Sequence, residues 1–224
     1  EIMAGAGVGT NGGSFGFTIS ENNWLGDGKE IAFDTEVTND SLRGTINYTD
    51  PNYDFLGNSL NYYLSSTSND KPDQGYENSI VSAGINTSFE QYKDLFATLG
   101  LNASYDDLRT TDNASASLRQ QSGEFSELAG VYGFALDKRN RTFMPTDGSI
   151  LSFNQVLPFY ADKSYISNTL AYSGYNTLTE NVVNATKFYV SAINGLGSDN
   201  VRVSKRNFLS TKRLRGFKRG KVGP

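Results

Sequence analysis

The sequence predicts an all-β protein, a transmembrane antiparallel β-barrel. First, apolar and polar residues alternate with a period of two along most of the 224 residues, which is typical of strands with one apolar and one polar face. Second, the segments between these strands are alternately short and long. Third, no stretch approaches the roughly 20 apolar residues that a membrane-spanning helix needs.

The alternating segments predict about eleven strands. After a segment rich in glycine and alanine at residues 4–9, we expect strands around residues 15–20, 31–37, 42–48, 60–64, 81–85, 97–101, 130–136, 151–159, 166–172 and 188–190. In a barrel the polar side chains of these strands face a wet lumen. The residues expected there are Asp34, Glu36, Asn47, Asn61, Asn86, Asn102 and Asn154.

The connections indicate how the strands are arranged. Residues 22–28, 50–57 and 90–94 are compact, whereas residues 67–78 and 108–124 are long and rich in Ser, Asn and Asp. Transmembrane barrels have short turns on the periplasmic side, longer loops outside and aromatic girdles at both interfaces. The aromatic residues at the short turns are Trp24, Tyr53, Phe55, Tyr92 and Phe143. The alternative is a soluble antiparallel barrel or sandwich, which does not require loops sorted by length.

The strand count predicts an incomplete barrel. Bacterial single-chain barrels have an even number of strands, and an unpaired strand edge in lipid costs several kcal/mol for each unsatisfied backbone group. We therefore expect more strands to follow and a further segment to precede residue 1. On this interpretation residues 1–194 hold the first eleven strands, and residues 195–224 begin a long loop.

The charge of the chain is divided unevenly. The net charge is −4, yet nine of the 20 Lys and Arg residues lie between Arg202 and Lys221. A basic cluster of this kind can attract the phosphates of nucleic acid. The remaining eleven basic residues face 24 acidic ones, so we expect no nucleic-acid partner.

The composition argues against an enzyme. The chain has no histidine and no cysteine, which removes the commonest general base and excludes a histidine- or cysteine-based triad. The remaining candidates are the carboxylate pairs Asp106 with Asp107 and Glu124 with Glu127. These acids lie near loop edges, so we interpret them as solvated polar residues and expect no catalytic site.

Two short motifs resemble cofactor and metal sites, but their context argues against both. Residues 7–12 fit G-x-G-x-x-G, yet a strand pattern follows where a dinucleotide fold needs a helix. Residues 50–54 begin like a calcium loop, but Phe55 stands where that loop requires glycine. We expect neither a cofactor nor a metal.

Four segments resemble a known family, the BamA-type outer-membrane protein assembly factors, also described as bacterial surface antigens. Residues 5–33 resemble its first three strands, including the turn at Trp24-Leu25-Gly26, and residues 48–60 resemble its turn between strands four and five. Residues 137–153 resemble the turn before strand nine. Most specific is Arg215-Gly216-Phe217, which matches the R-G-F motif of the family's sixth extracellular loop. The resemblance implies about eleven of sixteen strands, without the N-terminal POTRA domains.

The resemblance also assigns a role to the basic end of the chain. In the family this loop folds back into the lumen, and its arginine contacts acidic and aromatic groups on the inner wall. Arg215 offers five donors in a planar fork, Gly216 permits a tight turn and Phe217 supplies an apolar contact. The carboxylates of the barrel provide a negative interior, while the family's own acidic partner belongs to strands beyond this chain.

The first strand is the second feature with an implied function. Gly5, Gly7 and Gly9 leave little side-chain area to pack, and in the resembling proteins this strand forms a lateral gate. The glycines alternatively only relieve crowding at the seam.

The implied function is non-enzymatic insertion of unfolded β-barrel clients into the outer membrane of a Gram-negative bacterium. The implied partners are these clients, outer-membrane lipid and accessory lipoproteins recruited through POTRA domains. The alternatives are a two-partner secretion pore of the same superfamily and a passive diffusion porin.

Overall fold

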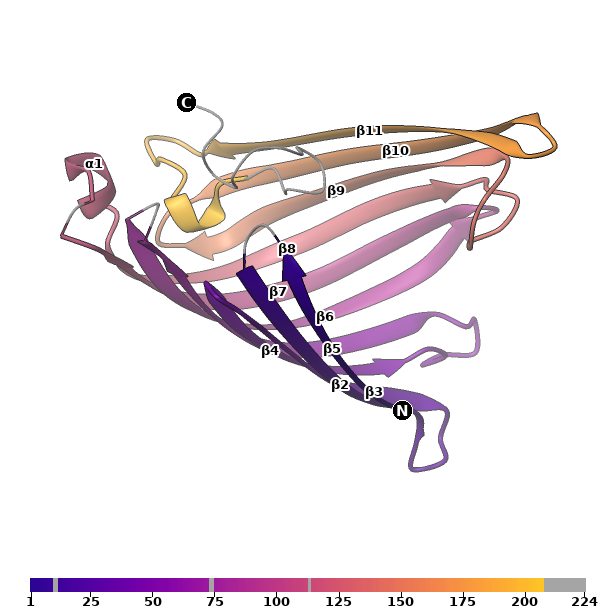
Figure 1. Cartoon of the computed structure of the whole chain (residues 1–224), viewed down its shortest axis with the longest axis horizontal. Helices are drawn as coiled ribbons and strands as arrows, with labels where there is room; N and C mark the ends of the chain where they lie inside the picture. The colour runs from indigo at the N-terminus through magenta and orange to yellow at the C-terminus, as the bar shows by residue number, and fades with distance from the viewer. Residues whose placement is uncertain (10–11, 73–74, 113, 208–224) are drawn as a thin grey trace.

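The protein is a single curved sheet of eleven antiparallel strands, paired in the order in which they occur along the chain (Figure 1). The computed structural model describes residues 1–9, 12–72, 75–112 and 114–207. Each strand pairs with the next through a connecting turn or loop, so the sheet is a continuous meander. β1 and β11 form its two edges. The predicted fold class and the number of strands are confirmed.

The elements follow one another as predicted, with longer strands in the middle of the chain. They are β1 (Ile2–Gly9), β2 (Gly12–Trp24), β3 (Lys29–Thr38), β4 (Ser41–Asp50), β5 (Ser59–Lys71), β6 (Tyr76–Tyr92), β7 (Leu95–Thr110), α1 (Ala116–Arg119), β8 (Gly123–Asp137), β9 (Gly148–Ala161), β10 (Tyr165–Thr179), β11 (Val182–Gly195) and the 3-10 helix η2 (Val203–Lys205). No helix in the described ranges is long and apolar enough to cross a membrane.

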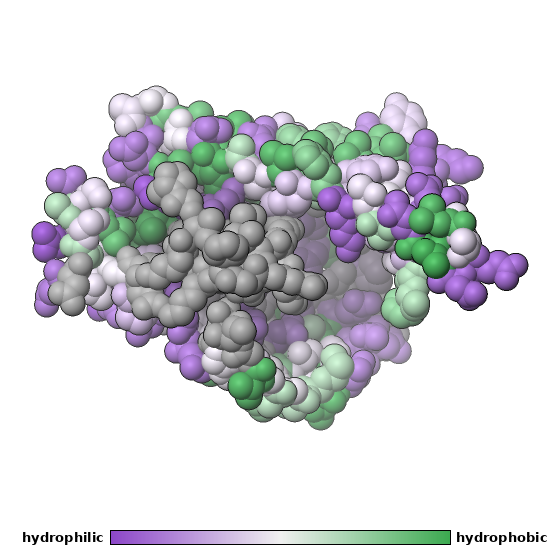
Figure 2. All heavy atoms as spheres, turned by 45° about the horizontal axis from the view of Figure 1, so that its top comes forward, coloured by the Kyte–Doolittle hydropathy of each residue, from purple (hydrophilic) through white to green (hydrophobic). Residues whose placement is uncertain are grey.

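The two faces of the sheet differ in polarity, as the alternation predicts. Residues paired across neighbouring strands share a face, and one such row joins Phe33, Ile46 and Leu64, which are exposed on the convex side. The next row joins Asp34, Thr45 and Ser65, which line a hollow on the concave side. Figure 2 looks obliquely towards this side, where hydrophilic residues are visible inside a partly hydrophobic rim. The concave face is therefore the polar lumen.

The two ends of the sheet carry different connections. One end, called the turn end, has the β2–β3, β4–β5, β6–β7, β8–β9 and β10–β11 connections, and the five predicted aromatic residues are exposed there. The opposite end, called the loop end, carries α1 and the residues that follow β11 (Figure 1).

The predicted loop at residues 67–78 is wrong in extent, because β5 continues to Lys71 and β6 begins at Tyr76. The ladder continues past the point where alternation fades: Ser68, Asn69 and Asp70 pair with Ser79, Asn78 and Glu77. Outside a bilayer both faces of a strand meet water, so periodicity no longer marks a strand whose backbone pairing persists.

Burial is concentrated at the loop end of β6, β7 and β8. The small apolar cluster there consists of Tyr76, Leu108 and Val203, with Leu118 and Phe125 packed against it. In contrast, none of the described residues of β1–β5 is buried. Since Val203 follows β11, this burial depends on chain that returns to the sheet after its last strand.

Candidate functional site

The predicted gate residues lie in β1, at one edge of the sheet. Gly5 pairs with Gly16, Gly7 with Ser14 and Gly9 with Gly12. Within the described residues, no heavy atom lies within 4 Å of a Cβ placed at Gly5. At Gly7 the nearest atom to such a Cβ is Oγ of Ser14, at 3.3 Å. Crowding within this part of the chain therefore does not require glycine at position 5.

The R-G-F motif, Arg215, Gly216 and Phe217, lies outside the described residues. The structure does describe the beginning of the same loop, residues 196–207, which we call the loop base. The loop base turns back over the lumenal face, and Nδ2 of Asn207 donates a hydrogen bond of 2.6 Å to Oγ of Ser191 on β11. The basic residues of this segment that the sequence left unassigned are Arg202, Lys205 and Arg206.

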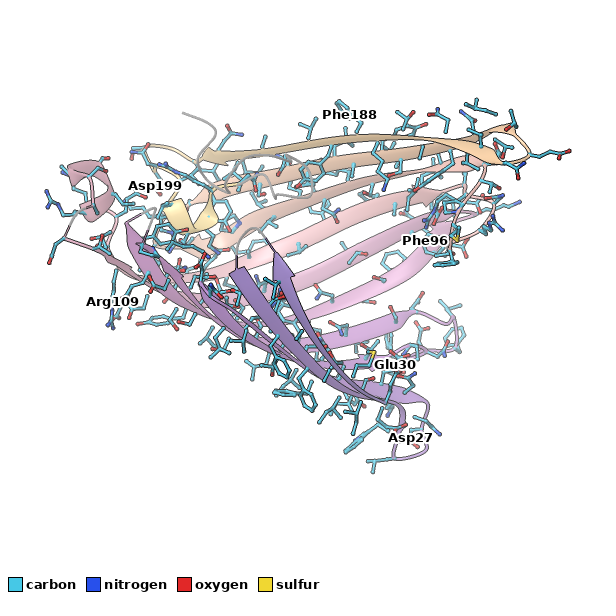
Figure 3. The ribbon with its side chains drawn as sticks, in the orientation of Figure 1. Asp27, Glu30, Phe96, Arg109, Phe188 and Asp199 are labelled. Atoms are coloured by element: carbon cyan, nitrogen blue, oxygen red, sulfur yellow. The ribbon has the colours of Figure 1, made fainter. Side chains whose placement is uncertain are left out.

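Asp199 fastens the start of the loop base to the β9–β10 turn at the loop end (Figure 3). Its carboxylate accepts a hydrogen bond of 2.9 Å from the Ser164 amide and one of 3.2 Å from Nζ of Lys163. The amide of Leu196 also donates to the Ser164 carbonyl, at 3.0 Å. The Ser164 amide and then the Lys163 ammonium group lower the pKa of the Asp199 carboxyl below its ordinary value.

Two buried carboxylates receive the basic side chains of the loop base. Nη1 of Arg202 lies 3.7 Å from Oδ2 of Asp106 on β7, and its Nη2 lies 3.6 Å from Oε2 of Glu127 on β8. Nζ of Lys205 lies 3.0 Å from the same Glu127 oxygen. The side chains of Arg202, Asp106 and Glu127 are 3%, 1% and 1% exposed. We call Asp106, Glu127, Arg202 and Lys205 the ion-pair cluster.

Polar groups of the barrel wall hold the carboxylates in place. Oδ1 of Asp106 accepts a hydrogen bond of 3.0 Å from Asn78 on β6, whose own side-chain oxygen accepts one from Asn69. Oε1 of Glu127 accepts a hydrogen bond of 2.8 Å from the Tyr165 hydroxyl on β10. Hydrogen bonds to a buried carboxylate offset part of the cost of removing it from water.

An apolar contact lies beside the charges. Val203 follows Arg202 directly and packs against Tyr76 and Leu108, while its amide donates to Oε1 of Gln121 at 2.9 Å. The Arg202 guanidinium carbon lies 4.3 Å from the centre of the Phe125 ring, within range of a cation–π interaction. The site can therefore hold a cationic peptide segment through charge, shape and main-chain hydrogen bonding.

The structure corrects the interpretation of the acidic residues. Asp106 and Glu127 are not solvated loop-edge residues, because each lies within a strand with its side chain on the lumenal face. Asp107 and Glu124 point the other way, and Asp107 pairs with the exposed Arg109 at 2.7 Å. The signal that was available in the sequence is the spacing of two along β7, which places Asp106 on the same face as Asn102 and Ser104.

Basic residues of the loop base dock against lumenal carboxylates ahead of the R-G-F motif. The contacts are made by Arg202 and Lys205, which the sequence did not single out, while the docking predicted for Arg215 lies outside the described residues and stays a prediction. The aromatic group in contact with the Arg202 guanidinium is Phe125. Nothing in the local pattern around Arg202 distinguishes it from its basic neighbours, since its role depends on strands 75 or more residues away.

A separate polar hollow of about 660 Å³ lies over β2–β5 on the lumenal face. Its lining includes Thr18, Asp34, Glu36, Arg43 and Asn47, and Oγ1 of Thr18 donates to Oδ1 of Asp34 at 2.8 Å. In the part of the chain that the structure describes, no group of three or more His, Cys, Asp or Glu residues is arranged to hold a metal ion. The hollow is a polar part of the lumenal wall, lined by residues of four neighbouring strands.

The fold of this chain is similar to that of a barrel of known structure. The chain is similar over 100% of its length to BamA from Haemophilus ducreyi lacking POTRA domains 1–3, with a TM-score of 0.85 and 22% sequence identity. It covers 46% of that chain, so it spans about half the length of the protein it matches. At this identity the similarity concerns the fold.

The sequence itself identifies the family. Residues 23–224 match the Omp85 superfamily domain, which covers all strands from β3 to β11, the end of β2 and the loop that contains both the ion-pair cluster's cations and the R-G-F motif. The match and the fold together indicate part of an outer-membrane β-barrel. The chain belongs to the Omp85 superfamily.

Proposed function

We propose that this chain is part of an outer-membrane protein assembly factor, which promotes the folding and insertion of β-barrel clients without an enzymatic step or a nucleotide. Membership of the Omp85 superfamily supports a role in outer-membrane protein assembly or secretion. The observation that carries the finer proposal is β1, an edge strand of 8 residues with glycine at alternate positions.

The composition of β1 favours pairing through the backbone alone. Gly5, Gly7 and Gly9 present no side chain on the lumenal face of β1. A strand that pairs with this edge is therefore held mainly by main-chain hydrogen bonds. Main-chain pairing gives affinity that does not depend on client sequence. A short, weakly packed seam also opens at a lower cost than one with well-packed cross-strand side-chain pairs.

The loop supplies the second element of the proposal. We assign Arg215, Gly216 and Phe217 to docking of the loop against the inner wall, with the guanidinium as the polar contact and the phenyl ring as the apolar one. Lys218, Arg219 and Lys221 are assigned to a solvated face of the loop.

The partners follow from the same proposal. They are unfolded outer-membrane protein clients, outer-membrane lipid at the seam, and accessory lipoproteins recruited through POTRA domains. The description of the similar BamA chain names POTRA domains 1–3 as the part that it lacks.

A secretion pore is the second candidate function, because the polar hollow over β2–β5 offers a hydrated wall. Reconstitution of the full-length protein in lipid vesicles separates the two functions. An assembly factor accelerates the folding of an unfolded barrel client, whereas a secretion pore or a porin gives steady ion conductance without acceleration.

The motif is tested in the same vesicles with matched variants. We expect Arg215→Ala to slow client folding more than Lys221→Ala, because only Arg215 belongs to the motif. Equal effects of the two substitutions would remove the role assigned to Arg215.

The seam is tested by a covalent lock. A disulfide between β1 and the last strand of the full-length barrel should abolish insertion while the barrel remains folded, and reduction should restore it. Unchanged insertion in the oxidised protein would exclude a gate at β1.

A further inference from the structure

We propose that the ion-pair cluster is a fixed anchor that holds the loop base to β7, β8 and β10 through Arg202 as a positioning residue, independently of the R-G-F motif. The part of the proposal that concerns gating rests on the proposed function. The consequence is that the loop base stays with this part of the sheet when the seam at β1 opens.

The charges of the ion-pair cluster balance one another in a buried place. Asp106 and Glu127 are diagonal neighbours on the lumenal face, since Asp106 pairs with Phe125 and Glu127 with Ser104. Two carboxylates so placed repel each other, and each is costly to remove from water without a partner. Arg202 and Lys205 bring two positive charges against these two negative ones, so the cluster as a whole is neutral when the loop base is docked.

Each carboxylate of the cluster directs one oxygen to the barrel wall and the other to the loop base. Asp106 accepts from Asn78 through Oδ1 and from the Ser204 hydroxyl through Oδ2, at 2.6 Å. Glu127 accepts from Tyr165 through Oε1 and faces Lys205 through Oε2. The wall therefore orients both carboxylates, while the loop base gives Asp106 a hydroxyl donor and gives Glu127 ion pairs with Arg202 and Lys205. Preorganised acceptors of this kind lower the ordering cost of docking.

The shape of the arginine side chain suits the position of residue 202. Arg202 lies between the two carboxylates and over the Phe125 ring. A planar guanidinium presents donors in two directions and stacks on an aromatic face, whereas an ammonium is a point charge. Arg202→Lys therefore retains the charge but loses the bridge between Asp106 and Glu127.

The contacts of the ion-pair cluster and of Val203 lie far from the β1 edge. The wall groups that meet Arg202, Val203, Ser204 and Lys205 belong to β6, β7, β8, β10 and the β7–β8 connection, which includes Gln121, the acceptor from the Val203 amide. These loop-base residues precede the R-G-F motif at residues 215–217. In the order of the sheet, β7 and β8 are separated from β1 by five or more other strands, so opening at β1 does not itself break the anchor.

The experiment measures access to the buried residue of the loop base. Val203→Cys and the exposed control Ser198→Cys are made one at a time in the full-length protein, in a background without other cysteines, and the protein is reconstituted in phosphatidylcholine vesicles. Reaction with a membrane-impermeant maleimide is followed without client. We expect Val203→Cys to react about tenfold or more slowly than Ser198→Cys, because Val203 is 7% exposed.

The anchor itself is tested by adding Arg202→Met to each cysteine variant, with Arg109→Met as the matched control. Arg202→Met should raise the reaction rate of Val203→Cys towards that of Ser198→Cys, and Arg109→Met should leave it unchanged. Arg202→Lys should give an intermediate rate. Equal rates in the Arg202→Met and Arg109→Met proteins would overturn the proposal.

A charge-balanced variant covers the case in which Arg202→Met does not refold. Asp106→Asn with Arg202→Met retains one anion and one cation, Glu127 and Lys205, and should refold with Val203→Cys partly protected. The control protein carries Asp106→Asn alone. If Val203→Cys reacts in this control as fast as Ser198→Cys does, and reacts no more slowly in the double variant, a charge-based anchor is contradicted.

The final measurement repeats the labelling while a client folds. An unchanged slow rate at Val203→Cys supports an anchor that stays closed, and a rise to the rate of Ser198→Cys would overturn it. Failure of the proposed function is visible separately, as the absence of accelerated client folding, while the labelling without client still tests the anchor.

Discussion

The strands near β1 and the strands around β7 follow the same alternating pattern but differ in what covers their lumenal faces. β1 has 8 residues and β6 has 17. The loop base lies over the ends of β6–β8 and buries Asp106, Leu108 and Glu127, while none of the described residues of β1–β5 is buried. In this sheet, extensive burial arises where a loop returns to the wall.

This difference implies an uneven distribution of stability. Local opening is easiest where few contacts are buried and backbone hydrogen bonds are exposed. The β1 side meets this description, and the β6–β8 side does not. The sheet therefore has one part suited to opening, near β1, and another part suited to holding the loop, at β6–β8.

The largest expected effect concerns the buried charges on the β6–β8 side of the sheet. Arg202→Met should destabilise the folded barrel by about 3 to 5 kcal/mol, because removing one partner of a buried ion pair leaves an uncompensated buried charge. The measurement is urea denaturation in vesicles, followed by the mobility of the folded form in unheated gels. Arg109→Met, which removes an exposed cation from the neighbouring outward face, should show no measurable change; a similar loss in both would contradict the contrast.

The second effect concerns apolar packing on the two sides. Leu108→Ala should cost about 2 to 5 kcal/mol, because Leu108 is 1% exposed and its truncation leaves a cavity against Tyr76 and Val203. Leu42→Ala, on the convex face of β4, should cost about 1 kcal/mol or less. The same denaturation experiment applies, and equal losses would indicate that burial at the loop base does not set local stability.

The third effect is at β1. A Cβ at Gly5 meets no described atom within 4 Å, so Gly5→Val should be accommodated and should stabilise the strand by up to about 1 kcal/mol, the span of strand propensities. If a weak β1 matters for function, the substitution slows client folding in vesicles.

Gly44→Val is the control for Gly5→Val. Gly44 has equally open surroundings but lies in β4, which is paired on both sides. It should leave client folding unchanged, and a slower rate in both variants would point to strand stiffness in general rather than to the seam.

The smallest effect is the pH dependence of the contact between Asp199 and the β9–β10 turn. Because its hydrogen bonds lower the pKa of Asp199 in the folded protein, its contribution is present above the ordinary value of 3.8 and is lost as the pH falls through the lowered folded value. Melting curves between pH 7 and pH 3 should show an acid-dependent loss that is smaller in Asp199→Asn. Equal acid sensitivity in the two proteins would exclude this carboxyl as its source.

Much of the fold was predictable because alternation is a local property. Polar residues such as Asp34 and Asn47 lie on the lumenal face as expected, and the aromatic residues Trp24 and Phe55 lie at the turn end as expected. The parts of β5 and β6 that lie between residues 67 and 78 were not predictable as strands, because backbone pairing continues there although neither face is apolar.

The sequence by itself determined the class of fold, the number of strands, the face on which side chains of the alternating segments lie and the concentration of basic residues after β11. Only the tertiary structure decided that Asp106 is buried while Asp107 is half-buried on the outward face, and that Arg202 lies between the carboxylates of β7 and β8. The reason is physical: alternation depends on neighbours along one strand, whereas burial of a charge depends on a distant segment that supplies its counter-ion and excludes water.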